Sequence, residues 1–91
     1  HLKSVILYGS YARGDYDEDS DIDIMLLVDL PTEEIEKYSD ELSELDFEYN
    51  VQYDVWMMPV VKNQLHFAKW TEAYPFYSNV KREGVVLYEA A

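Results

Sequence analysis

Two carboxylates, Asp21 and Asp23, stand two positions apart at the start of an apolar run. On an extended strand, residues i and i+2 point to the same face about 7 Å apart, so both carboxylates can reach one or two cations. Mg²⁺ prefers oxygen ligands and commonly takes one or two carboxylates together with substrate phosphates. This spacing therefore predicts a magnesium site beside a phosphate-bearing substrate.

A glycine and a serine supply groups that can hold those phosphates. Gly9 follows the apolar run 4–8, which has the pattern of a buried strand, and Ser10 opens a short helical segment that Gly14 closes. At a strand-to-helix junction, glycine lets the backbone approach a ligand, and the free N–H groups of the first turn attract anions. Gly9 and Ser10 are therefore the candidate phosphate site. A cation is needed there, because two carboxylates would otherwise repel the phosphates.

Two further side chains are candidates for the same site. Asp54 lies in an alternating apolar pattern over residues 51–58, which predicts a third strand that Pro59 ends. On that strand Asp54 is expected to ligate a second metal or to act as general base, with a surface ion pair as the alternative. Arg13 is expected either to contact a triphosphate or to bond nearby acids and helix carbonyls.

The rest of the sequence predicts the elements that position these residues. The nearly continuous apolar run 22–28 is typical of a strand covered on both faces, and residues 15–20 form an acidic, solvated loop before it. A helix that begins at Pro31 is expected to pack on the sheet, because its apolar positions recur at spacings of three and four. Helices near 60–69 and 74–83 and a strand at 85–88 complete the prediction. We therefore expect a single α/β domain over residues 1–91, with a small mixed β-sheet of three to four strands flanked by helices.

Composition limits the partners. Nineteen acidic and seven basic residues give a formal charge of −12, so direct DNA binding is not expected, because affinity for nucleic acid depends on Lys and Arg. A nucleotide can still bind if a divalent metal supplies positive charge, and basic protein partners are favoured. The absence of cysteine excludes thiolate sites and fits the cytoplasm. No apolar run approaches the length of about 18 residues that a membrane span needs.

The spacing of these residues resembles a known signature. Gly9-Ser10, followed after ten residues by Asp21-x-Asp23, resembles the motif of the DNA-polymerase-beta-like nucleotidyltransferase superfamily, and Asp54 matches its third carboxylate. More narrowly, residues 9–14 and 20–23 look like those of minimal nucleotidyltransferases that serve as antitoxins beside HEPN-domain toxins. The resemblance implies a nucleotidyltransferase fold and Mg²⁺-dependent transfer of AMP from ATP to a tyrosine hydroxyl of the toxin. Because such families usually carry a helix before the first strand, we also expect that helix to be missing from these residues.

Other functions stay open at this point. The same fold can act on a small molecule such as an antibiotic, with the acceptor site completed across a dimer or by a separate subunit. The chain can also be a non-catalytic binding antitoxin, although a pure binder has no need to keep Asp21 and Asp23. The sequence does not decide whether the chain forms a homo- or a hetero-oligomer. It does not decide which nucleotide base is preferred either. A cluster of aromatic residues is predicted to be core, with a docking surface as the alternative: Trp70, Tyr74, Phe76 and Tyr77.

Overall fold

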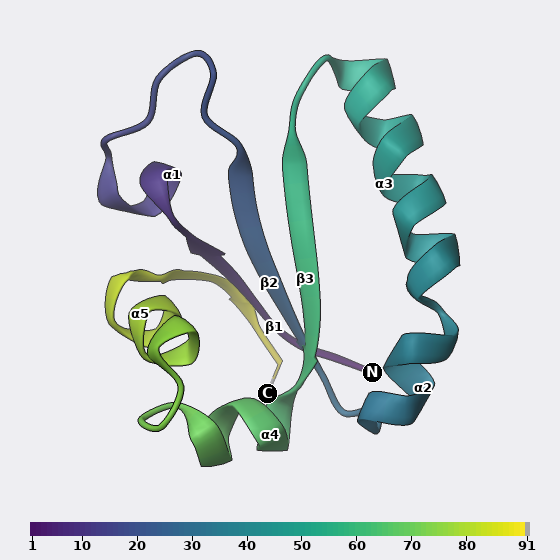
Figure 1. Cartoon of the computed structure of the whole chain (residues 1–91), viewed down its shortest axis with the longest axis vertical. Coiled ribbons are helices and arrows are strands. Elements are labelled where there is room, and N and C mark those ends of the chain that lie inside the picture. Colours follow the sequence, from purple (N-terminus) through teal and green to yellow (C-terminus); the bar gives the residue numbers. More distant parts are fainter. Residues whose placement is uncertain (91) are drawn as a thin grey trace.

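A four-stranded mixed sheet forms the centre of the protein (Figure 1). The computed structural model describes residues 1–90, apart from the side chain of Met58. In the strand order β3-β2-β1-β4, β1 runs antiparallel to β2 and β4, whereas β2 and β3 are parallel. The strands are β1 (Leu2–Tyr8), β2 (Ile22–Val28), β3 (Met57–Asn63) and β4 (Val85–Glu89). The α/β class and the small mixed sheet expected from the sequence are confirmed.

The helices cover the sheet from two sides. In Figure 1, α2 and α3 lie along one side, and α4 and α5 lie on the other. The helices are α1 (Ser10–Arg13), α2 (Thr32–Lys37), α3 (Ser39–Tyr53), α4 (Gln64–Trp70) and α5 (Pro75–Glu83). Within residues 1–90, none of them has both the length and the apolar character that crossing a membrane requires.

The buried core lies between β1, β2 and the pair α4–α5. Its fully or nearly buried side chains are Ile6, Met25, Leu27, Phe67, Tyr77 and Val80. Along the β1–β2 ladder, Ile6 pairs with Met25, and two residues further along Tyr8 pairs with Asp23. Because side chains alternate between the faces of a strand, Asp23 shares the face of Met25 that α5 covers. The core therefore determines which side of the sheet the Asp23 carboxylate occupies.

The opposite face is covered more loosely, by α2 and α3. No residue of α3 is buried, and an apolar groove of about 430 Å³ remains between this helix and the sheet. The single helix predicted from Pro31 is two helices that break at Tyr38. There the Tyr38 N–H donates to the Ile35 carbonyl, and the Ser39 hydroxyl donates to the Glu36 carbonyl. A serine that bonds a nearby carbonyl competes with the regular helical ladder, which explains the break.

The predicted third strand at residues 51–58 is wrong. Helix α3 continues to Tyr53, and Asp54 ends it in the left-handed conformation, at φ 52° and ψ 47°. Asp54 tolerates this conformation better than most residues. Strand β3 begins only at Met57. The Asn50 side chain forms hydrogen bonds with both the N–H group and the carbonyl of Met57.

The helix predicted near residues 60–69 begins later in the structure, at Gln64. Pro59 lies inside β3 and does not end it, because β3 is an edge strand, where a residue without an N–H group is tolerated. The strand continues to Asn63, whose side chain accepts from the His66 N–H and so caps α4. By contrast, the sequence correctly predicted three other features, namely β2, the start of α5 at Pro75 and the final strand.

Replacing Met25 with alanine tests where the core lies. Met25 is 0% exposed, so Met25→Ala should lower the free energy of unfolding by about 2–5 kcal/mol. Leu65→Ala is the matched control, because Leu65 is 77% exposed and its loss should change stability by no more than about 0.5 kcal/mol. Urea denaturation followed by circular dichroism measures both. Equal losses from the two variants would contradict the core described above.

Candidate functional site

The turn between β1 and α1 is built around Gly9. Gly9 has φ 73° and ψ −154°, and its carbonyl accepts from the N–H groups of Ala12 and Arg13, both at 3.1 Å. A positive φ favours glycine. A Cβ atom at this position would also lie 2.3 Å from Asp23 Oδ2. The missing side chain is therefore what lets the Asp23 carboxylate lie directly against the turn.

The two aspartates predicted to bind metal lie at this turn. Asp23 stands in β2 opposite Tyr8, and Asp21 directly precedes the strand. Burial raises the pKa of Asp23 above its ordinary value, the negative charge of Asp21 raises it further, and Arg13 partly offsets this. The two carboxylates are therefore close enough to repel each other, which is the electrostatic condition that a cation relieves.

A pocket of about 340 Å³ opens beside this pair. Gly9, Ser10, Arg13 and Asp23 line it on the side of the turn. This volume is at the lower end of the range of small-molecule sites, about 300–1,000 Å³. The structure thus places the predicted phosphate-binding residues and one predicted metal ligand, Asp23, around one open space, whereas Asp21 is exposed just before β2 and does not line it.

Helix α5 supplies the other wall of the pocket, which the sequence reasoning missed. Phe76, Asn79 and Glu83 line it, and the Phe76 ring makes an edge contact with Tyr8 at 5.6 Å between centroids. These residues recur at spacings of three and four, so they share one face of α5. The two polar residues on that face were the signal available in the sequence.

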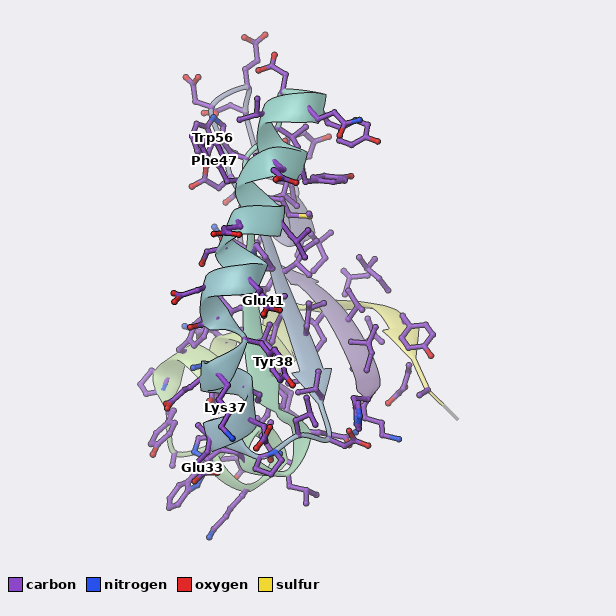
Figure 2. The ribbon with its side chains drawn as sticks, turned by 90° about the vertical axis from the view of Figure 1, so that its right-hand side faces the viewer. Glu33, Lys37, Tyr38, Glu41, Phe47 and Trp56 are labelled. Atoms are coloured by element: carbon purple, nitrogen blue, oxygen red, sulfur yellow. The ribbon has the colours of Figure 1, made fainter. Side chains whose placement is uncertain are left out.

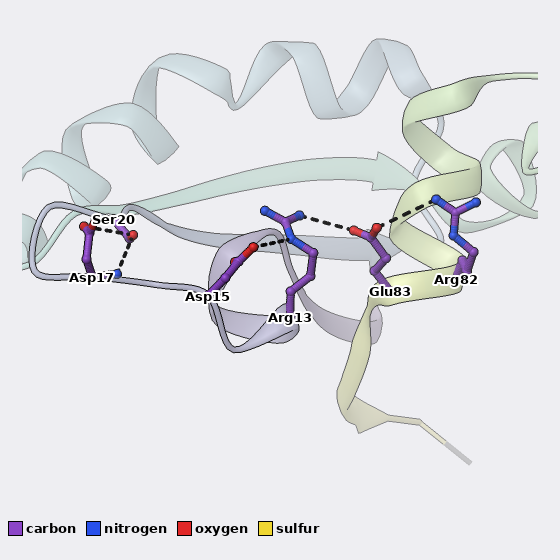
Figure 3. Close-up of polar contacts among 6 residues, drawn as sticks. All are labelled: Arg13, Asp15, Asp17, Ser20, Arg82 and Glu83. Atoms are coloured by element: carbon purple, nitrogen blue, oxygen red, sulfur yellow. Dashed lines mark hydrogen bonds and ion pairs between the residues drawn. The ribbon is translucent and has the colours of Figure 1, made fainter.

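Arg13 joins the two walls of the pocket. Its Nε donates to Asp15 Oδ2 and its Nη1 to Glu83 Oε2, both at 3.2 Å, as Figure 3 shows. These bonds raise the pKa of Arg13. Of the two expected roles, the structure therefore shows the pairing with acids. The guanidinium nevertheless lines the pocket, where incoming phosphates can compete with Glu83 for it.

The acidic loop before β2 closes on itself. The Asp17 N–H donates to Ser20 Oγ at 2.9 Å, and Ser20 Oγ donates to Asp17 Oδ1 at 3.3 Å (Figure 3). Asp17 Oδ1 also accepts from the Asp19 N–H. The Asp17 side chain therefore forms its hydrogen bonds within the loop, as expected of a solvated connector. These bonds also hold the backbone in place just before Asp21.

Asp54 is not assembled with the aspartate pair. It is exposed at the end of α3, two residues before Trp56, whose carbonyl accepts from the Ile22 N–H at 2.6 Å. Within residues 1–90, no three His, Asp or Glu side chains come close enough together to hold a metal unaided. Asp21 and Asp23 would therefore leave most coordination positions to phosphates and water, which suits Mg²⁺.

Comparison with known proteins decides the family. A profile of the nucleotidyltransferase domain family matches residues 2–86. The chain belongs to this family. The predicted nucleotidyltransferase fold and superfamily are thereby confirmed, and the domain is an enzyme of the nucleotidyltransferase type.

Two relatives of this nucleotidyltransferase come from Methanocaldococcus jannaschii, and both are provisionally named protein adenylyltransferases. One is 38% identical over 87 residues, which are 96% of this chain and 79% of the relative. The other is 43% identical over 61 residues, which are 66% of this chain and 59% of the relative. The similarity to the first relative thus extends over almost the whole domain.

Substituting Gly9 tests the contact on which the site depends. Gly9→Ala should weaken nucleotide binding by about tenfold or more, because the new Cβ displaces the Asp23 carboxylate, and it should destabilise the fold by about 1–3 kcal/mol. Gly14→Ala is the matched control, because Gly14 also has a positive φ, 83°, but nothing lies within 4 Å of its Cβ position. Calorimetric titration with ATP and Mg²⁺ measures binding. If both variants lost the same affinity, the contact with Asp23 would have no special role.

The pH dependence of stability tests the environment of Asp23. Because the fold raises the pKa of Asp23, the protonated carboxyl group stabilises the folded state at acid pH. This stabilisation is lost as the pH rises through the pKa that Asp23 has in the folded protein. Asp23→Asn should therefore gain stability over the native chain as the pH rises from about 3 to 7. Asp19→Asn, which removes one charge from the exposed loop, corrects for the general effect of charge. A difference between Asp23→Asn and native that stays constant with pH would contradict the assignment.

Proposed function

We propose that this nucleotidyltransferase uses Mg²⁺ to transfer AMP from ATP to a hydroxyl group of a partner protein. The observation that carries the proposal is the Asp23 carboxylate against the Gly9 turn, with Asp21 beside it. The names of the two relatives support protein as the acceptor. The small pocket agrees with an acceptor that arrives attached to a partner.

Asp21 and Asp23 would hold the metal. Their mutual repulsion and the burial of Asp23 favour a cation between the carboxylates and the triphosphate. When bound, Mg²⁺ neutralises phosphate charge and makes the attacked phosphorus more electrophilic. Ser10 lines the same pocket, and its hydroxyl can donate to a phosphate oxygen. We assign the β and γ phosphates to the Gly9-Ser10 turn.

The reaction joins the acceptor oxygen to the α-phosphorus of ATP. The bond from this phosphorus to the bridging oxygen breaks, and pyrophosphate leaves with its electron pair. The hydroxyl proton passes to a carboxylate or to water. In this proposal Asp54, which is exposed at the end of α3 and lies outside the aspartate pair, takes that proton from an acceptor that comes from solvent.

We infer further that the partner is a HEPN-domain toxin and that the acceptor is a tyrosine hydroxyl. The support is the resemblance of residues 9–14 and 20–23 to the antitoxin type of minimal nucleotidyltransferase. AMP attached to the toxin would then silence it, and both proteins would act in the cytoplasm.

Incubation of the protein with the proposed HEPN-domain partner, ATP and Mg²⁺ tests this function. Mass spectrometry should find one or more AMP groups on a toxin tyrosine. Asp23→Asn should lower the rate about a hundredfold or more. Removing a metal ligand should reduce activity at least as much as removing a group that hydrogen-bonds to the ligand. Asp19→Asn, with the same change of charge, should keep the native rate.

No adduct with the native chain, or an equal adduct with Asp23→Asn, would overturn the proposal. Turnover of a free aminoglycoside without any protein would instead favour a small-molecule acceptor. If the double variant Asp21→Asn, Asp23→Asn neutralised the toxin as well as the native chain does, the protein would be a binding antitoxin.

A further inference from the structure

Three large apolar side chains near the C-terminal end of α3 contribute little to the fold. Phe47 and Trp56 are each 69% exposed, and Val51 is 66% exposed. Phe47 and Val51 are four residues apart in the helix, so they share one face. Figure 2 shows Phe47 and Trp56 on the same side of α3, whereas Tyr38 and Glu41 point to the other side, toward the sheet. Single exposed apolar residues are common, but several together indicate an interaction site.

The charged residues of α3 and of the segment that follows it all have one sign. Glu41 and Asp46 line grooves toward the sheet, whereas Glu44 and Glu48 lie beside Phe47. Residues 38–56 contain no basic residue. They contain six acidic ones: Asp40, Glu41, Glu44, Asp46, Glu48 and Asp54. In the described part of the chain, none of the six forms an ion pair. A partner for this surface must therefore bring positive charge to it.

The arrangement at Phe47 indicates which cations fit. Glu44 and Glu48 stand one on each side of Phe47 in sequence, and together with Ser43 the three residues line a shallow hollow. An aromatic ring attracts a cation over its face, and carboxylates bond guanidinium groups strongly. A hollow lined by an aromatic ring and two carboxylates is thus suited to an arginine or lysine side chain that also packs its apolar stem.

The same surface continues to the catalytic strand. The carbonyl of Trp56 accepts from the Ile22 N–H, and the next residue, Met57, pairs with Ile22 in the sheet. Ile22 stands between Asp21 and Asp23. A protein segment held at Trp56 is therefore only a few residues away from the carboxylates that we assign to the metal.

We propose that Glu44, Phe47, Glu48, Val51 and Trp56, here called the α3 surface, bind a basic amphipathic segment of the acceptor protein. Phe47 and Trp56 anchor the apolar side of that segment, and Glu44 and Glu48 pair with its basic side chains. The six acidic residues within 38–56, with no basic residue among them, steer such a partner to this face. The inference rests on the proposed function, because it names the contact that delivers the acceptor to the site.

A helical peptide of leucine, alanine and arginine, labelled with fluorescein, is a direct probe. It carries leucine along one face and arginine at both margins, and a second peptide with glutamine for arginine is its neutral control. Fluorescence anisotropy should show saturable binding of the basic peptide to the native chain and none of the neutral one. The double variant Phe47→Ala, Trp56→Ala should bind about tenfold more weakly or worse, as loss of interface anchors does.

A charge-matched pair of variants separates this surface from general attraction. Glu44→Gln, Glu48→Gln should weaken peptide binding about fivefold or more and reduce its salt dependence. Glu33→Gln, Glu36→Gln removes the same charge from exposed positions of α2 and should change the affinity by less than about twofold. Equal losses from both pairs, or unchanged binding in the Phe47→Ala, Trp56→Ala variant, would overturn the proposal.

Two further measurements distinguish failure of this surface from failure of the proposed function. Binding of a fluorescent ATP analogue with Mg²⁺ should be unchanged in the Phe47→Ala, Trp56→Ala variant, while AMP transfer to the toxin falls. If that variant transferred AMP at the native rate, the α3 surface would be wrong and the function would stand. If the native chain bound the peptide but modified no protein, the function would fail instead.

Discussion

The close approach of the Asp23 carboxylate to the backbone of Gly9 is the contact on which the site depends. It requires a residue without a side chain at the end of β1, and it requires β2 to pair with β1 so that Asp23 stands opposite Tyr8. The buried residues on the same face of these strands keep that register, because a slip of one residue would turn Asp23 away from α5. Packing of the core thus determines where the charge of the site lies.

Electrostatics then limits what the protein can bind. The chain carries a charge of −12, and Asp21 and Asp23 repel each other within a partly buried site. A triphosphate alone would add to this repulsion, whereas a divalent cation reverses it. In our proposal the α3 surface uses the same excess of acidic residues for a different purpose, because there the cations would belong to a protein partner. The acidic composition would then account for both the metal and the choice of acceptor.

Local patterns predicted the part of the site that is continuous in sequence. The run 22–28, the turn glycines and the start of α5 at Pro75 each follow from neighbouring residues, and they lie where expected. Asp54 could not be placed in this way, because α3 buries no residue and its last turn therefore shows no helical apolar period, and pairing with β2 decides where β3 begins. The α5 wall of the pocket depends likewise on how a distant helix packs over the turn.

The location of a bound divalent cation tests this account most directly. Mn²⁺ can replace Mg²⁺ in such sites and broadens the amide signals of nearby residues in nuclear magnetic resonance spectra. Titration of Mn²⁺ into the ¹⁵N-labelled chain should broaden the amides of Gly9, Ser10 and residues 21–23 first, and Asp21→Asn, Asp23→Asn should abolish that effect. Broadening that begins at the acidic loop 15–19 or along α3, and that persists in the double variant, would contradict a metal site at the aspartate pair.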